Sequence, residues 1–172
     1  MRRFPIVLAA AAIALPAVAA PASVTVDLKG PGGESLGQAT ITEGARGVVV
    51  RVEAKGLTPG WHGLHFHEKG DCSTKDFKSA GGHVHDVAEV VHGFLAKGHN
   101  DAGDLPNLYA GPDGAAMAEV FTPFVTLAGG GDKPALLDAD GSAVVIHARA
   151  DDYTSQPIGG AGDRVACAVI GK

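Results

Sequence analysis

Apolar and polar residues alternate with a period of two in the segment 23–29. Between residues 23 and 29, two valines and a leucine alternate with polar side chains. This is the pattern of a β-strand that buries one face. The same alternation, or a short run rich in β-branched residues, recurs at 36–42, 47–54, 63–67, 115–121, 124–127, 143–148 and 164–170. Short strands separated by turns predict an all-β fold, an antiparallel sandwich or barrel.

Two long segments lack this periodicity. Residues 68–106 are rich in Gly, Asp, Lys and His and contain four of the eight histidines of the chain. Residues 151–163 are rich in glycine and contain three acidic residues. Structureless loops of this length are uncommon within compact domains and usually have a function. We therefore expect the chemistry of the protein in these loops.

The first residues have the pattern of a targeting segment. Arg2 and Arg3 precede an apolar run over 4–14, and Ala17 and Ala19 are small residues at a cleavage site. This predicts a signal peptide over 1–19, cleaved near 19–22, and a single domain over 23–172 that works in a periplasm. A retained N-terminal anchor is the alternative, and the absence of a second apolar run in the sequence speaks against it.

The charge balance excludes two classes of partner. The chain has 14 Lys plus Arg and 19 Asp plus Glu, and losing Arg2 and Arg3 takes the net charge from −5 to −7. Because the remaining sequence has no basic stripe, we expect no nucleic-acid partner. An acidic exported protein is also not expected to bind an anionic membrane surface.

The chain has two cysteines, Cys72 and Cys167. In an oxidising compartment an isolated pair favours a disulfide. A pair of metal ligands is the alternative reading of the same two residues.

Histidines and carboxylates indicate a metal site. His65 and His67 lie at i and i+2 of an expected strand, so both imidazoles point to one face and can reach one ion. Alone, this pair is a weak signal. It is followed by further side chains of the kinds that bind copper and zinc, namely His83, His85, His92, His99, Asp101, Asp104 and His147.

The segments around these residues resemble one family. They are 63–68 (GLHFHE), 70–72 (GDC), 79–83 (SAGGH), 103–106 (GDLP), 147–152 (HARADD) and 160–171 (GAGDRVACAVIG). In this order they are similar to the copper–zinc superoxide dismutases, in particular the bacterial periplasmic type. The resemblance extends over nearly all of the exported chain. It implies an eight-stranded antiparallel Greek-key β-barrel and superoxide as the substrate.

The resemblance also implies roles for individual residues. Copper would be held by His65, His67, His83 and His147, and His83 would bridge copper to zinc. Cys72 and Cys167 would form the disulfide of the family. The remaining roles implied are those of Asp151, a carboxylate that links a copper histidine to a zinc histidine, and of Arg164, the active-site guanidinium that steers the anion. Without the resemblance, Arg164 could equally form a surface ion pair with Asp163.

The zinc site departs from the family pattern. His92 and Asp104 match zinc ligands, but the position three residues before Asp104, where the family usually has histidine, is Asp101. The spacing favours Asp101 as the fourth ligand. His99 is the alternative, and a weak or empty zinc site is a third outcome.

Three other functions compete with the dismutase. One is a non-enzymatic, metal-carrying domain of the same fold, which would be expected to lack part of the copper set or Arg164. Another is a dismutase with copper alone, and the presence of His92 and Asp104 argues against it. A third is a β-sandwich that stores zinc or binds a partner, which leaves Asp151 and Arg164 without a role. The oligomeric state stays open between a monomer and a homodimer.

Overall fold

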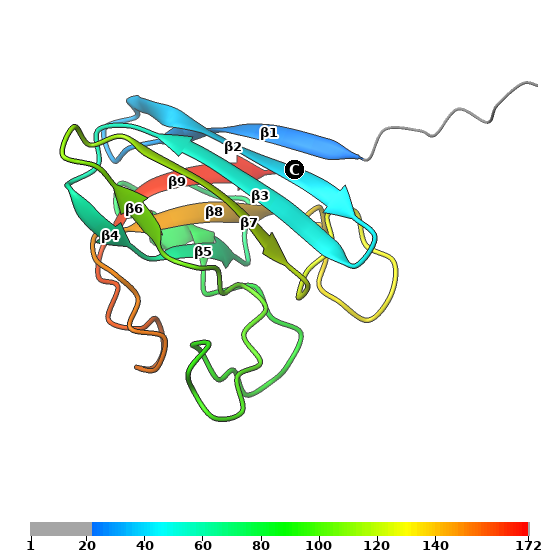
Figure 1. Ribbon diagram of the computed structural model, residues 1–172. Coiled ribbons are helices and arrows are strands. Elements are labelled where there is room, and N and C mark those ends of the chain that lie inside the picture. The colour runs from blue at the N-terminus through cyan, green and yellow to red at the C-terminus, as the bar shows by residue number, and fades with distance from the viewer. Residues whose placement is uncertain (1–21, 172) are drawn as a thin grey trace, which may run out of the picture.

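The computed structural model describes residues 22–171, which form one antiparallel β-sheet rolled into a nearly closed barrel (Figure 1). The strands of this part of the chain are β1 (Ser23–Lys29), β2 (Ser35–Gly44), β3 (Gly47–Ala54), β4 (Gly60–His62), β5 (Leu64–His67), β6 (Leu108–Ala110), β7 (Ala116–Thr122), β8 (Ser142–His147) and β9 (Arg164–Ile170). The expected signal peptide, residues 1–19, lies outside the described residues.

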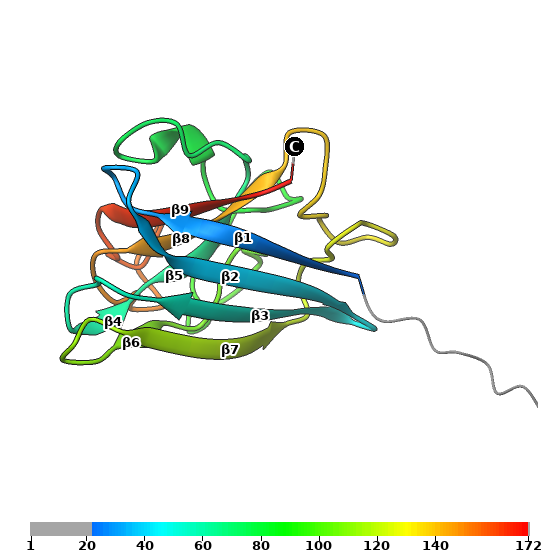
Figure 2. The ribbon, with the colours of Figure 1, turned by 90° about the horizontal axis from the view of Figure 1, so that it is seen from above.

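Strand order explains how the barrel closes. The strands pair in the order β4-β6-β7-β3-β2-β1-β9-β8-β5, so β4 and β5 occupy the two edges of the sheet. Only Gly63 separates these two edge strands along the chain. Its N–H donates to the carbonyl of Arg149 at 2.7 Å, and its own carbonyl accepts from the N–H of His147 at 2.8 Å. The backbone of Gly63 therefore links the edge strand β4 to the end of β8, which is the neighbour of the other edge strand, β5. Figure 2 shows β9, β1, β2, β3 and β7 side by side in this order.

The period-two pattern places the core inside the barrel. On β5, Leu64 and Phe66 point inward and are fully buried in the main hydrophobic cluster. On β8, Val144 and Ile146 do the same. Residues at the odd-numbered positions of both strands point to the other face. That face carries a second, smaller cluster, formed by Phe77, Ala80, Ala143, Val145 and Cys167.

Two long loops cover the face of β5 and β8 that points away from the barrel interior. The loop after β5 contains one short 3₁₀ turn, Lys78–Ala80, and the other loop connects β8 to β9. In Figure 1 parts of both loops project below the barrel. In residues 22–171 no helix is long and apolar enough to cross a membrane.

The predicted all-β barrel is confirmed, with nine strands because β4 and β5 count separately on either side of Gly63. The expected strands over 47–54 and 164–170 match β3 and β9 residue for residue. The strand expected over 124–127 is wrong, since this segment makes only an isolated bridge between Thr126 and Ala135. Sequence patterns missed β4 and β6, which have three residues each.

Candidate metal centre

The strands bring three of the candidate histidines together. His65 and His67 lie on β5 opposite Val145 and Ala143 of β8, and His147 ends β8. His83 comes from the loop and pairs with His67 through an isolated antiparallel bridge. All four imidazoles are buried, because the two long loops cover the outer face of these strands.

Four buried nitrogen atoms in this group have no hydrogen-bond partner in the described structure. They are Nδ1 of His65, Nε2 of His67, Nε2 of His83 and Nε2 of His147. One ligand atom from each of these residues can be chosen so that all lie within 4.8 Å of one another. Buried polar atoms are rarely left unpaired. Four unpaired nitrogens that converge therefore fit a metal ion, and imidazole nitrogen suits copper.

The opposite ring nitrogen of each strand histidine is engaged by an acceptor. His65 Nε2 donates to Asp151 Oδ2 at 2.9 Å, His67 Nδ1 to the carbonyl of Gly81 at 3.0 Å, and His147 Nδ1 to the carbonyl of Gly162 at 3.0 Å. A neutral imidazole carries one proton, so these bonds place the lone pair on the converging nitrogen. The surrounding structure thus sets the tautomer that a metal needs.

The pKa values of these three histidines favour the neutral form. Burial, together with other nearby histidines, lowers the pKa of His65 to about 4 and that of His147 to about 3. Burial also holds the pKa of His67 well below its ordinary value. The rings are therefore neutral near pH 7, which is the state in which histidine binds a metal.

A second group of side chains surrounds the other side of His83. Nδ1 of His83 lies 2.7 Å from Asp101 Oδ2 and 3.3 Å from Asp104 Oδ1. Nδ1 of His92 lies 3.3 Å and 2.7 Å from the same two oxygens. Two ligand atoms of a tetrahedral zinc ion are about 3.3 Å apart. Two nitrogens and two carboxylate oxygens at these distances fit zinc.

Hydrogen bonds link the two histidines and the two aspartates of this second group. Burial would lower the pKa of His92, but hydrogen bonds to Asp101, Asp104 and Asp151 outweigh it and raise that pKa to about 11. Burial would also lower the pKa of His83, but its hydrogen bonds to Asp101 and Asp104 outweigh burial and raise that pKa. Burial would raise the pKa values of both aspartates, and their bonds to the two histidines lower them instead. A zinc ion would take the place of the protons in these hydrogen bonds.

The structure brings Asp101, and not His99, against both histidines. Nε2 of His99 lies 3.1 Å from Oδ2 of Asp104, the oxygen that faces away from His83. His65, His83, His92 and Asp104 also form a compact group. Because Nε2 of His65 is bound to Asp151, only its Nδ1 is free, and that atom belongs to the four-histidine group. Asp101 has the direct contacts to His83 and His92.

Asp151 connects the two groups. Its Oδ2 accepts from His65, and its Oδ1 lies 3.1 Å from Nε2 of His92. The side chain of Asn107 fixes the backbone of Asp151, because its Oδ1 accepts from the N–H at 2.9 Å and its Nδ2 donates to the carbonyl at 2.9 Å. Asp151 thus orients one histidine of each group.

Arg164 is held against the loop after β5. Its guanidinium donates to the carbonyls of Phe77 and Gly81, at 2.6 Å each. The carbonyl of Gly81 also accepts from His67. The salt bridges found in residues 22–171 do not include a pair between Arg164 and Asp163. The charge of Arg164 is close enough to His67 and His147 to contribute to the lowering of their pKa values.

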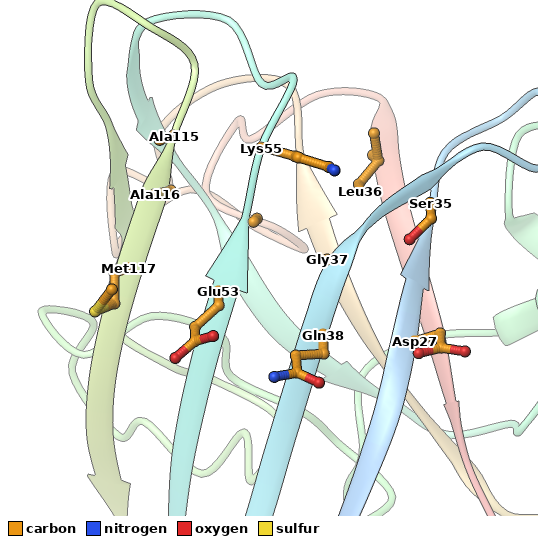
Figure 3. A pocket seen from close by; sticks show the side chains of 11 residues that line it. Asp27, Ser35, Leu36, Gly37, Gln38, Glu53, Lys55, Ala115, Ala116 and Met117 are labelled. Atoms are coloured by element: carbon orange, nitrogen blue, oxygen red, sulfur yellow. The ribbon is translucent and has the colours of Figure 1, made fainter.

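A cavity of about 300 Å³ leads to these residues. Its lining includes His67, His83, His85, Pro157, Ile158 and Arg164. A larger hollow of about 590 Å³ lies along β1, β2, β3 and β7, lined by residues that include Asp27, Glu53, Lys55 and Met117 (Figure 3). The lining of this larger hollow contains no histidine, so we place the chemistry at the smaller cavity.

The predicted disulfide between Cys72 and Cys167 is present and joins the loop after β5 to β9. His62 and His85 belong to neither group of converging side chains. His62 is buried, and its two ring nitrogens each lie 2.7 Å from a carbonyl oxygen, those of His147 and Thr58. His85 is exposed, and its Nδ1 donates to the carbonyl of His83 at 2.7 Å.

Sequence patterns gave no sign of the supporting residues. The side-chain amides of Asn107 and Gln156 bond the backbones of Asp151 and His92, and the carbonyl of Gly81 accepts from His67. Their contacts are with residues far away in the chain, so no local pattern could have indicated them.

Comparison with known proteins points to one family. The family described as copper/zinc superoxide dismutase (SODC) matches residues 35–170. A Cu-Zn superoxide dismutase of Caulobacter vibrioides is 60% identical over 148 residues, which cover 86% of this chain and 85% of that protein. The Cu-Zn superoxide dismutase of Escherichia coli K12 is 37% identical over an alignment that covers 99% of both chains.

Solved structures agree with these matches. A superoxide dismutase-like protein from Bacillus subtilis superposes with a TM-score of 0.79 at 38% identity, covering 85% of this chain and 97% of that one. A Cu/Zn superoxide dismutase from Brucella abortus superposes with a TM-score of 0.68 at 31% identity, covering 87% and 99% of the two chains.

Proposed function

The chain belongs to the copper/zinc superoxide dismutase family, and we propose that the histidine cluster between β5, β8 and the two long loops is its active site. Copper and zinc are the cofactors of this family. The proposed copper ligands are His65, His67, His83 and His147. The proposed zinc ligands are His83, His92, Asp101 and Asp104.

One observation carries this proposal. Each of the four copper histidines has one buried nitrogen without a partner, and these atoms converge. On the three strand histidines the second nitrogen is fixed by an oxygen acceptor, so the free nitrogen carries the lone pair. A fold that needed these histidines only for packing would leave no such set of unpaired atoms.

The reaction converts two superoxide anions and two protons into dioxygen and hydrogen peroxide. Copper held by His65, His67, His83 and His147 would supply the one-electron oxidation and reduction of superoxide, and zinc held by His83, His92, Asp101 and Asp104 would orient the ring of His83. Nδ1 of His83 lies beside Asp101, and its Nε2 is buried without a hydrogen-bond partner. The centroid of the His83 ring lies 4.1 Å from that of His65 and 5.0 Å from that of His67. Nε2 of His83 is therefore the atom at which a proton can be held and delivered.

Arg164 supports the choice of an enzyme over a metal carrier. The mature chain has a net charge of −7 and should repel an anion. Arg164 lines the cavity that leads to His67 and His83, which gives the mouth of the site a fixed positive charge. Local focusing of this kind can raise association rates by roughly 10–1000-fold. A carrier would need no such group.

The protein loaded with copper and zinc is expected to disproportionate superoxide, at a rate that falls as ionic strength rises because salt screens the attraction to Arg164. Stopped-flow measurement of superoxide decay at several salt concentrations checks this. The metal-free protein is the control. Activity no higher than that of the same amount of free copper would contradict the enzyme.

Replacing Asp101 with alanine is expected to weaken zinc binding more than replacing His99, because Asp101 contacts both zinc histidines directly. Of the proposed zinc ligands, His99 bonds only Asp104, and through one carboxylate oxygen, so its loss should weaken zinc binding by about tenfold, the lower end of the effect of losing a residue that orients a metal ligand. Competition with a zinc chelator measures both variants. If only the His99→Ala variant loses zinc, the assignment of Asp101 is wrong.

We further propose that the signal peptide over 1–19 is removed near 19–22 and that the enzyme works in the periplasm. The disulfide supports this location, because disulfides persist in oxidising compartments. The mass of the exported protein tests it.

We also propose that the protein forms a homodimer. Trp61 and Tyr109 are 57% and 51% exposed on β4 and β6 and pack edge to face, with ring centroids 4.9 Å apart. Tyrosine and tryptophan are enriched at interfaces, so this pair supports a second copy as the occupant of that surface. Sedimentation equilibrium tests the mass in solution.

A further inference from the structure

Gln156 contacts a zinc ligand through that ligand's backbone. Its side-chain Oε1 accepts from the N–H of His92 at 2.9 Å, and its Nε2 donates to the carbonyl of His92 at 2.8 Å. The two residues are 64 positions apart in the chain. One primary amide thus occupies both polar groups of a single backbone unit, as a neighbouring strand would.

His92 lies in a segment without a strand of its own to align it. Its ring uses both nitrogens for orientation, with Nδ1 beside Asp104 and Nε2 beside Asp151. These contacts turn the ring but do not fix the backbone. The amide of Gln156 does, because it bonds both polar groups of the His92 backbone.

The two long loops approach each other closely around this contact. The N–H of Leu95 donates to the carbonyl of Tyr153 at 3.0 Å. Gly93 has a φ of +97°, and a Cβ on it would collide with the carbonyl of Tyr153. Pro157 and Ile158 directly follow Gln156 and line the cavity above the proposed copper site. Gln156 therefore joins the zinc-binding loop to the wall of that cavity.

We propose that Gln156 is a positioning residue for the zinc site, which clamps the backbone of His92 in the place where its ring meets Asp101, Asp104 and Asp151. This inference rests on the proposed zinc ligands. It sets zinc apart from copper, because His65, His67 and His147 are held by β5 and β8 and do not depend on the clamp.

Replacing Gln156 with alanine is expected to weaken zinc binding by about tenfold, the lower end of the effect of losing a residue that orients a metal ligand. Gln156 is exposed, so the effect should not be larger. Copper binding should stay unchanged. Chelator competition measures both metals on the full-length protein, and the visible absorption of bound cobalt(II) should change because the position of His92 changes.

Three variants sharpen this test. Gln156→Met keeps the length of the side chain without its polar atoms and should behave like Gln156→Ala. Ser155→Ala is the matched control, since Ser155 bonds Asp152 in the same loop and should bind zinc like the parent. Asp104→Ala should lose zinc and the cobalt spectrum altogether.

The outcomes separate the inference from the proposed function. Zinc binding and a cobalt spectrum unchanged in Gln156→Ala, with Asp104→Ala impaired, would overturn the clamp alone. An equal loss of zinc and copper in Gln156→Ala would also overturn it, since the loop would then act on folding. Unimpaired zinc binding by Asp104→Ala would overturn the zinc site itself.

Discussion

Replacing His83 with alanine is expected to lower dismutase activity by more than about 100-fold. Losing a residue that only orients a metal ligand already costs up to about 100-fold, and losing a ligand should cost more. His83 offers Nε2 to the proposed copper group and Nδ1 to the zinc group, so one substitution removes a ligand from each. Superoxide decay in a stopped-flow instrument measures the activity. Metal analysis of the same sample should show zinc bound more weakly than in the parent.

His85→Ala is the matched control for this substitution. His85 lies two residues further on, lines the same cavity and bonds the backbone carbonyl of His83, but it is exposed and is not one of the proposed ligands, so the comparison isolates the loss of the His83 ring. Circular dichroism of both variants establishes that the barrel is folded. A folded His83→Ala variant whose activity stays within about tenfold of the parent would contradict the shared ligand.

Replacing Cys72 and Cys167 together with serine is expected to lower the free energy of unfolding by about 2–5 kcal/mol. The disulfide joins residues 95 positions apart, and in the chain-entropy account opening a loop of this size costs about 4–5 kcal/mol. Urea denaturation of the metal-free protein measures the change, because bound metal would add its own stabilisation.

The same variant also loses the covalent link between β9 and the loop whose carbonyls bind Arg164. Phe77 and Gly81, whose carbonyls accept from Arg164, lie in the loop that the disulfide ties to β9. Thr74→Ala is the control in this loop, because it removes a side chain that bonds Ser79 and Asp76 and leaves the covalent link in place. A loss of less than about 1 kcal/mol in the serine variant would count against the covalent link as a main source of stability.

The barrel could be predicted because the alternation of apolar and polar residues is local. β3 and β9 follow directly from it. The segment 124–127 was misleading, because Val125 and Leu127 are buried like strand residues, yet the N–H of Leu127 is bound by the carboxylate of Glu43 at 2.6 Å. A side chain from β2 thus takes the place of a strand partner. β4 and β6 are too short to show a period.

The candidate site was predictable in a different way. The spacing of His65 and His67 indicates a shared face, and similarity to a known family indicates His83 and His147 as their companions. Which carboxylate lies beside His83 depends on how the loop over 85–104 folds back. No periodicity describes that path, and the clamp by Gln156 depends on a second loop. Contacts between two irregular segments have no signature in either segment alone.

The alternation on β5 has a consequence for engineering. Leu64 and Phe66 pack in the barrel interior, whereas His65 and His67 point to the opposite face, toward the proposed metal site. A donor that replaces one of these imidazoles therefore lies on the face away from Leu64 and Phe66. Ligand variants on this strand can be compared with one another on the same barrel interior.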